Sequence, residues 1–397
     1  MHPAPARRVE RLYESTIRGL TVYALERGAI NLGQGSPDFE PPPALLEAAT
    51  KALLSGPNQY VPTWGLPALR LAIAEKTERF YGFRPDPQSE ITVTCGVTEA
   101  VISALVGLVD EGDRVVILEP AHENYHAGVT FAGAEAIWVP IRPPEFRFDP
   151  DELRAAFARP RVKAVIFNTP HNPSGRVFSR AELQTIADLC LEFGVIAIAD
   201  EIYEHMVYDG LEHVPIATLP GMMDRTVTIS GLSKSYSVTG WRVGYAIAPE
   251  ALTNALRKIH DFTTICAPAP LQQAAITAMK LGPEYYAWLE GYYLERRSRM
   301  MGILAAAGFD APTPEGAYYT LADFRPLADR LGLPYDDTAF VTWMIDALGI
   351  GAIPGSSFYR SDPALGAGRV RFAFPKRDET LDEVARRFEK LKVLAGV

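Results

Sequence analysis

Short apolar runs recur along the middle of the chain. Seven of them predict β-strands, at residues 91–94, 114–118, 136–140, 164–168, 195–199, 226–230 and 244–248. Several runs are apolar on both faces, which is typical of strands in a sheet that helices cover on both sides. Amphipathic stretches such as 98–109 and 180–193 lie between the runs and predict helices. We therefore expect an α/β fold with a seven-stranded, mostly parallel sheet.

The two ends of the chain follow other patterns. Residues 1–30 predict an arm followed by a short helix, and 44–54 and 66–81 predict amphipathic helices. After about residue 282 the pattern predicts a long helix (284–307), a strand–turn–strand (308–324), a helix (337–348), a loop (353–358), a strand (369–374) and a C-terminal helix. We expect an N-terminal arm (1–30), a large domain (44–283) and a smaller α+β domain (31–43 and 284–397).

Composition and charge narrow the class of protein. Of the 397 residues, 48% are hydrophobic and 22% are charged, as in ordinary globular proteins. A net charge of −9 disfavours nucleic acid and anionic membranes as partners. The three cysteines form no CxxC pair, so neither a disulfide framework nor a thiolate zinc site is expected. We find no signal-peptide core and no apolar run of about 18 residues, so we expect no membrane span and a cytoplasmic location.

The first predicted strand runs into a turn that suits phosphate. The turn is Thr94-Cys-Gly-Val-Thr-Glu-Ala100, in which Gly96 allows a tight bend. The amides of Gly96, Val97 and Thr98 are expected to face outward at a helix N-terminus, which favours an anion. The turn matches neither GxGxxG nor a P-loop, and many strand–helix turns without a ligand share its pattern.

Two further strands lead to polar residues. Asn172 lies in the loop Asn168-Thr-Pro-His-Asn-Pro-Ser-Gly175, which two prolines and a glycine make rigid. Asp200 ends a buried run, and Tyr203 follows three residues later. A carboxylate at a strand end is usually a helix cap or a surface residue. The functional alternative is a carboxylate that keeps a pyridine nitrogen protonated, with Tyr203 reaching the same ring.

A Ser/Gly-rich loop after the run 226–230 carries Lys234, and Arg242 follows eight residues later. Most loop lysines are solvated charges. A lysine held at a strand end can also lose its proton and form a Schiff base with an aldehyde cofactor. Taken with the phosphate cup, Asn172 and the Asp200–Tyr203 pair, Lys234 and Arg242 fit pyridoxal phosphate.

Three motifs carry a resemblance to a known family: Asn-Leu-Gly-Gln-Gly (31–35), Asn-Thr-Pro-His-Asn-Pro (168–173) and Ser-Lys-x-x-x-x-x-Gly-Trp-Arg-Val-Gly (233–244). Over about residues 15–390 the chain resembles the class I, fold type I aminotransferases, and among them the kynurenine/glutamine and methionine aminotransferases. The resemblance implies the aspartate-aminotransferase-like fold, pyridoxal 5′-phosphate as cofactor, and a homodimer with shared active sites. It implies transfer of an amino group between an L-amino acid and a 2-oxo acid by ping-pong half-reactions.

The resemblance also implies a role for each matching residue. Lys234 forms the Schiff base with the cofactor and then moves the substrate α-proton, while Asp200 pairs with the pyridinium. Tyr203 and Asn172 bind the phenolic oxygen. The Arg371 side chain, helped by the Gly35 backbone, holds the substrate α-carboxylate. The phosphate contacts implied are those of Gly96, Val97, Thr98 and Arg242, with Tyr60 reaching the phosphate in a second subunit.

Two positions depart from the family pattern. Many relatives carry a phosphate-binding serine three residues before the lysine, where this chain has Gly231. Either Ser230 or Ser233 replaces that contact, or the hydrogen bond is missing. The residue stacked over the pyridine ring is usually Phe, Tyr or Trp, whereas this chain has His122. A histidine ring stacks but also titrates, so His122 is either a tolerated flat ring or a sign of altered chemistry.

Alternatives to transamination come from different classes. The nearest is another pyridoxal-phosphate reaction on the same fold, by a β-lyase, oxidase-like or cyclising enzyme, because His122 is unusual. A non-catalytic cofactor-binding regulator is disfavoured because we see no DNA-binding extension. The segment His122-Glu-Asn-Tyr-His126 matches the zinc-peptidase pattern HExxH. Pro120 places its first histidine in a turn rather than on a helix, so no metal is expected.

Substrate side chains have three candidate contacts. Arg18 either meets a side-chain carboxylate or is an exposed residue of the arm. Tyr125 and Phe358 either line an apolar side-chain pocket or belong to the core.

Overall fold

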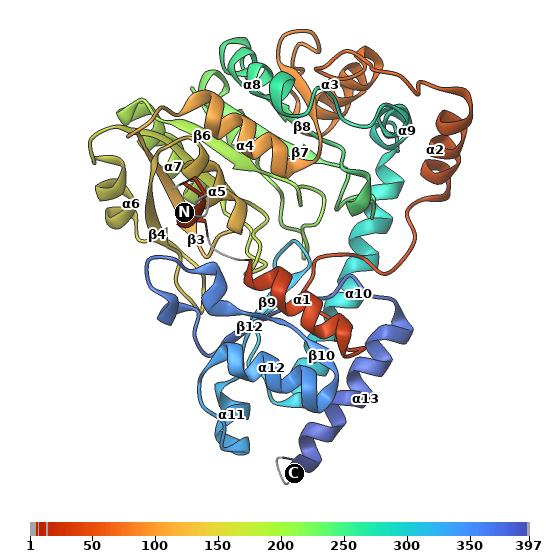
Figure 1. The fold of residues 1–397 in the computed structure, drawn as a ribbon, viewed down its shortest axis with the longest axis vertical. Coiled ribbons are helices and arrows are strands. Elements are labelled where there is room, and N and C mark those ends of the chain that lie inside the picture. The colour runs from red at the N-terminus through yellow and green to blue at the C-terminus, as the bar shows by residue number, and fades with distance from the viewer. Residues whose placement is uncertain (1–4, 7, 13–14, 395–397) are drawn as a thin grey trace.

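The main feature of the fold is a seven-stranded sheet (Figure 1). The computed structural model describes residues 5–6, 8–12 and 15–394, so parts of the predicted arm (1–4, 7 and 13–14) lie outside the described residues. The strands lie in the order β2 (Ile91–Thr94), β8 (Gly244–Ile247), β7 (Thr226–Gly231), β6 (Ile196–Asp200), β5 (Val162–Asn168), β3 (Arg114–Glu119) and β4 (Glu135–Pro140). β8 pairs antiparallel with both neighbours, and the other pairs are parallel. The predicted mostly parallel sheet is confirmed.

Helices cover both faces of this sheet, as its doubly apolar strands predict. One face packs on α4 (Val97–Leu108), α5 (Glu123–Phe131) and α8 (Glu250–Thr263). The other packs on α6 (Pro150–Phe157) and α7 (Arg180–Phe193). A third apolar cluster joins β2 and β8 to α2 (Pro43–Ser55), α3 (Pro67–Tyr81) and α9 (Ala269–Met279). The start of a helix is well predicted where the sequence carries capping residues. Ser179 and Glu182 are an example, because they form a capping box at the start of α7.

A second region packs around a three-stranded sheet of order β11 (Ile353–Pro354), β12 (Arg369–Ala373) and β9 (Tyr319–Asp323). Its buried side chains form one cluster with those of the long helix α10 (Pro283–Ala307) and of α11 (Arg325–Leu331), α12 (Asp337–Leu348) and α13 (Asp378–Leu394). β1 (Ile30–Asn31) pairs with β10 (Ile350–Gly351), which brings the 31–43 segment to this region. The predicted domain boundaries themselves stay a prediction.

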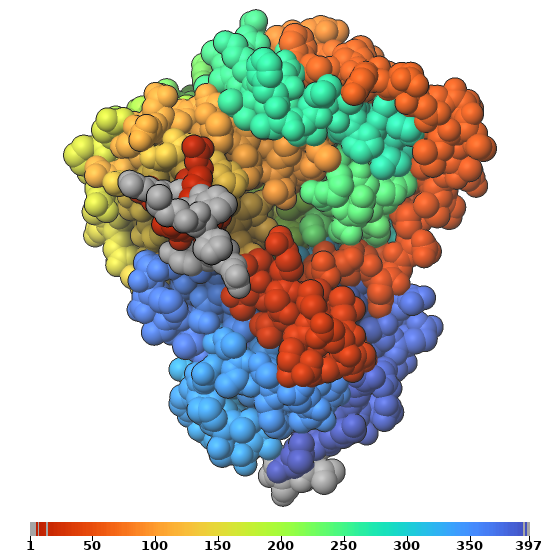
Figure 2. All heavy atoms as spheres, in the orientation of Figure 1, coloured from red at the N-terminus to blue at the C-terminus, as the bar shows by residue number. Residues whose placement is uncertain are grey.

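The short helix α1 (Thr16–Glu26) lies across the junction of the two regions (Figure 2). It follows a Ser15 cap, whose side chain accepts from the Arg18 amide. Ile17 of this helix lines the cavity described below. The N-terminal part of the chain is therefore part of the wall of that cavity.

The strand–turn–strand predicted for residues 308–324 is only half right. Residues 319–323 form β9, but the preceding segment makes only isolated bridges, from Asp310 to Asp323 and from Gly316 to Val207. Pro312 and Pro314 have no backbone N–H to donate to a neighbouring strand, which accounts for the missing ladder.

The strand directions bring the predicted chemistry to one edge of the large sheet. β6 ends at Asp200, β7 ends just before the Lys234 loop, and β2 ends at the turn that starts α4. Because β8 is antiparallel to β2 and β7, its first residues meet their last ones. Arg242, two residues before β8, is thereby placed beside the turn at Gly96. Ligands bind at this edge in open α/β sheets.

Candidate active site

A cavity of about 410 Å³ lies between this edge and the smaller sheet. It brings together residues that are far apart in the sequence and that the sequence analysis selected. The predicted site residues that line it are Gly35, Val97, Thr98, His122, Asn172, Asp200, Tyr203, Ser233, Lys234, Arg242 and Arg371. Gly96 and Tyr60 are not among its lining residues.

Lys234 has a directed and buried amine. Its Nζ donates to the Gly35 carbonyl at 2.9 Å and lies 5.9 Å from the centre of the Tyr203 ring. Burial lowers the pKa of Lys234 from its ordinary value, while Tyr319 opposes that change. An amine in this position gives up its proton more readily than a solvated lysine, which is what a nucleophilic or basic lysine requires.

Asp200 presents a carboxylate whose orientation is fixed. Its Oδ2 accepts from Tyr125 Oη at 2.7 Å, and its Oδ1 accepts from the Ile202 amide at 3.2 Å. The Asn168 side chain donates to the Asp200 carbonyl at 2.7 Å. Burial raises the pKa of Asp200 to about 6, although the hydrogen bond from Tyr125 opposes it. A cation in the cavity would return this group to full ionisation.

The turn predicted to bind phosphate lies at the start of α4. Gly96 has φ of 79°, and its own N–H donates to the Thr94 carbonyl at 2.8 Å. The amides at the start of a helix have no partner within it, so Val97 and Thr98 supply the outward donors. A Cβ on Gly96 would lie 2.3 Å from an Arg242 guanidinium nitrogen. Gly96 thus contributes close approach to Arg242 rather than a donor.

Arg371 lies buried at the opposite end of the cavity. One guanidinium nitrogen donates to Asn172 Oδ1 at 2.8 Å and another to the Gly33 carbonyl, while Nε has no partner among the described residues. The Tyr319 and Phe358 rings lie on it, with centres 4.5 and 4.8 Å from the guanidinium carbon. A buried cation with donors to spare is suited to an anionic group of a ligand.

His122 caps α5 instead of lying on a helix. Its Nδ1 accepts from the Asn124 amide at 3.4 Å. Burial, together with the nearby Arg371 cation, lowers the pKa of His122 to about 4, so the ring is neutral at pH 7. A neutral ring favours the flat-ring interpretation over proton transfer. Across the described parts of the chain, no group of three or more His, Cys, Asp or Glu side chains is placed to hold a metal.

The two serines proposed as replacements at the Gly231 position have different surroundings. Ser233 lines the cavity, whereas Ser230 Oγ donates to Glu204 at 2.7 Å, on the side of the sheet away from it. A Cβ on Gly231 would lie 2.9 Å from both Gly244 Cα and the Val243 carbonyl oxygen. Glycine at this position is therefore required by the close pairing of β7 with β8.

The remaining candidates divide between the surface and the core. Tyr60 is 81% exposed, and Arg18 is exposed on α1 beside a neighbouring groove. Phe358 is buried under Arg371. Tyr125 lines the cavity while binding Asp200, so it has a polar role that the sequence analysis did not assign.

Sequence reasoning missed two tyrosines at the start of β9. Tyr318 Oη donates to the Gly35 carbonyl at 2.8 Å, and Tyr319 Oη lies 3.1 Å from Tyr203 Oη. A Cβ on Gly35 would collide with the Tyr319 hydroxyl, so this glycine makes room for it. The Tyr-Tyr pair looks like core in the sequence, because aromatic residues are common in strands.

The chain is similar to proteins of one functional class. The family described as aminotransferase class I and II matches residues 27–388. A probable N-succinyldiaminopimelate aminotransferase from Mycobacterium tuberculosis is 39% identical over 394 residues, which cover 96% of this chain and 97% of the relative. The methionine aminotransferase of Escherichia coli is 34% identical over 387 residues, 98% of each chain. The solved structure of the M. tuberculosis N-succinyldiaminopimelate aminotransferase matches with a TM-score of 0.93 at 38% identity, covering 98% of this chain and 100% of that one.

Proposed function

Because this chain belongs to the class I and II aminotransferase family, we propose that its central cavity binds pyridoxal 5′-phosphate. The enzyme moves an amino group between an amino acid and a 2-oxo acid, and it has the aspartate-aminotransferase-like fold that the resemblance implies. The observation that carries the cofactor proposal is the buried Lys234 amine sharing one cavity with the Asp200 carboxylate.

The phosphate end of the cofactor fits the start of α4. Val97 and Thr98 offer helix N-terminal amides, and Arg242 adds a guanidinium beside Gly96. Ser233 lines the same cavity and is the serine available for a phosphate contact, since Ser230 is bound to Glu204. We propose that these residues hold the phosphate.

The ring end fits the carboxylate and hydroxyl groups beside β6. When bound, the cofactor supplies an aldehyde for an amine and a ring that accepts electron density. The Asp200 carboxylate would hold the proton of the ring nitrogen, because a buried carboxylate gains most from an opposite charge. Asn172 uses its Oδ1 for Arg371, which leaves its amide N–H groups, with Tyr203 Oη, to donate to the ring oxygen.

Lys234 is the residue that we propose moves the proton. Its lowered pKa and its bond to the Gly35 carbonyl give a directed amine that can take the α-proton of an amino acid. Arg371 would bind the α-carboxylate and so orient the α-carbon toward Lys234. Proton transfer would use Lys234, which follows β7 of the large sheet, and carboxylate binding would use Arg371 on β12 of the small sheet. The substrate therefore has to contact residues from both sheets at once.

We further propose that the enzyme is a homodimer. Tyr60 is 81% exposed and Phe262 is 93% exposed, and exposed apolar side chains that gather on one surface mark protein–protein interaction sites. His260 lies 2.7 Å from the Thr63 carbonyl, so the segments that carry these two residues lie side by side. Replacing Phe262 by Asp should yield monomers in sedimentation, whereas replacing exposed Trp288 by Asp should not.

The test of the proposed function is a spectral titration of the purified enzyme with pyridoxal phosphate and a panel of amino donors. We expect at least one donor to convert the bound cofactor to its amino form, and a 2-oxo acid to reverse the conversion. Absence of that conversion with every donor would contradict transamination. Binding of the cofactor without conversion would instead favour one of the other pyridoxal-phosphate reactions.

A further inference from the structure

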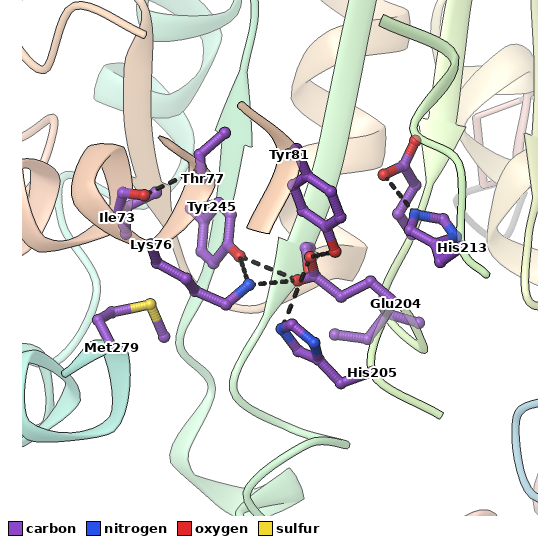
Figure 3. Close-up of polar contacts among 12 residues, drawn as sticks. Ile73, Lys76, Thr77, Tyr81, Glu204, His205, His213, Tyr245 and Met279 are labelled. Atoms are coloured by element: carbon purple, nitrogen blue, oxygen red, sulfur yellow. Dashed lines mark hydrogen bonds and ion pairs between the residues drawn. The ribbon is translucent and has the colours of Figure 1, made fainter. Parts of the chain in front are cut away.

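A buried polar cluster lies behind the turn that carries Asp200 and Tyr203. Residues 201–206 follow β6 directly. Asp200 and Tyr203 line the cavity, whereas Glu204 is not among its lining residues. Figure 3 shows Glu204 meeting side chains from other elements. We call this set the Glu204 cluster; its members are Lys76, Tyr81, Glu204, Ser230 and Tyr245.

The Glu204 carboxylate joins three elements of the fold. Its Oε1 accepts from Lys76 Nζ at 2.8 Å, from Ser230 Oγ at 2.7 Å and from Tyr245 Oη at 3.2 Å. Its Oε2 accepts from Tyr81 Oη. The turn after β6 is thereby tied to α3, β7 and β8 through one side chain.

The ion pair in this cluster is almost fully buried. The Lys76 and Glu204 side chains are 2% and 6% exposed. Burial has the largest single effect and raises the pKa of Glu204, but the neighbouring Lys76 charge and the hydrogen bonds from Lys76 and Tyr81 together hold that pKa well below its usual range. Burial lowers the pKa of neighbouring His205, so Lys76 is the cation that balances Glu204. Buried ion pairs add little net stability, so stability alone does not account for this one.

The backbone transmits the position of Glu204 to the cavity. The Glu204 amide donates to the Glu201 carbonyl at 2.9 Å, and the Ile202 amide donates to Asp200 Oδ1 at 3.2 Å. Tyr203 is the neighbour of Glu204 in the same turn. A displacement of Glu204 therefore displaces the Tyr203 hydroxyl and the Asp200 carboxylate together.

We propose that Glu204 is a positioning residue, which with Lys76 fixes the turn that aims Asp200 and Tyr203 at the cofactor. The inference rests on the proposed function, because it needs a cofactor ring opposite Asp200. Glu204 touches neither cofactor nor substrate. It acts through the two residues that do.

The test uses the cofactor-loaded variant Lys76→Met/Glu204→Leu. Removing both charges together leaves neither buried alone, so the protein is expected to fold. We expect kcat to fall roughly 10- to 100-fold and the KM of the amino donor to change less than about threefold, because misplacing a catalytic group costs rate rather than carboxylate binding. We also expect the pH midpoint of the visible absorption band of the bound cofactor to shift, since Asp200 governs the charge on the ring.

A conservative variant and a control separate positioning from stability. In Lys76→Met/Glu204→Gln the amide can still bond Ser230 and Tyr245, so kcat and the midpoint should return toward wild type. Leu153→Ala truncates a buried residue of α6 and should lower the melting temperature without altering either quantity. If Lys76→Met/Glu204→Leu keeps the wild-type kcat and midpoint, or if Leu153→Ala reproduces its changes, the proposal is wrong.

A milder variant covers the case in which Lys76→Met/Glu204→Leu does not fold. Tyr81→Phe/Tyr245→Phe keeps both rings but removes two hydroxyl donors from Glu204. This variant should shift the pH midpoint of the cofactor absorption band in the same direction as Lys76→Met/Glu204→Leu, but by a smaller amount. An unchanged pH midpoint would overturn the proposal. The failure of the proposed function has a different signature, since wild-type enzyme itself would then convert no amino donor.

Discussion

Replacing Arg371 by lysine keeps the positive charge at the end of the cavity but removes the planar fork of the guanidinium. Arg371 is 2% exposed and already uses two of its nitrogens, on Asn172 and the Gly33 carbonyl. A guanidinium has five N–H donors, so donors remain for a substrate carboxylate. A lysine ammonium has three donors in all, and two of them would be needed to satisfy the same protein acceptors.

The expected loss follows from this count. Arg371→Lys should forfeit at least one charge-assisted hydrogen bond to the α-carboxylate, worth about 1.5–3 kcal/mol. That free energy corresponds to a roughly 10- to 150-fold increase in the KM of the amino donor. The affinity for the cofactor should stay the same, because Arg371 lies at the opposite end of the cavity from the phosphate cup.

Steady-state kinetics with one amino donor measures the effect, and fluorescence titration of the cofactor-free protein measures cofactor affinity. Arg369→Lys is the matched control, since Arg369 lies on the same strand but faces Asp323, 3.4 Å away, instead of the cavity. An unchanged KM in Arg371→Lys would refute the carboxylate assignment. An equal rise in Arg369→Lys would show that a disturbed β12, rather than lost recognition, is responsible.

Three other substitutions test the site. Lys234→Ala should abolish both multiple turnover and the absorption band of the lysine-bound cofactor, and sustained turnover in a continuous assay would contradict its role. Burial raises the pKa of Asp200 in the folded protein to about 6, so the cofactor-free protein loses stability as pH rises from about 4 to 6. Calorimetry should therefore show that Asp200→Asn raises the melting temperature more at pH 7.5 than at pH 4. Gly231→Ser should cost about 1–3 kcal/mol by crowding Gly244 and Val243, seen as a lower denaturation midpoint, without tighter cofactor binding.

The sequence predicts the large sheet well because its strands are apolar on both faces and are separated by capped helices. It also predicts which residues reach one edge, since strand ends share an edge whenever the strands are parallel. Lys234, Asp200 and Asn172 are examples, and they line one cavity with Arg371, which comes from β12 of the smaller sheet. The roles that we assign to them stay proposals.

What the sequence could not show depends on directions and distances. Ser230 and Ser233 are equally polar, and only the orientation of Ser230 toward Glu204 separates them. The Tyr318 and Tyr319 hydroxyls become polar groups of the site only because Gly35 lies beside them. No local pattern encodes these contacts, because Ser230 and Glu204 are 26 positions apart and Gly35 and Tyr318 are 283 positions apart.

The bond from Arg371 to the Gly33 carbonyl spans 338 positions of the chain. During synthesis the Lys234 amine therefore leaves the ribosome about 140 residues before the arginine that would select its substrate. At translation rates of about 5–20 residues per second, that interval lasts roughly 7 to 30 seconds. A nascent chain thus carries Lys234 before it has any means of choosing a carboxylate. The burial that lowers the pKa of Lys234 and the arginine that would select a substrate are therefore both acquired only as the fold is completed.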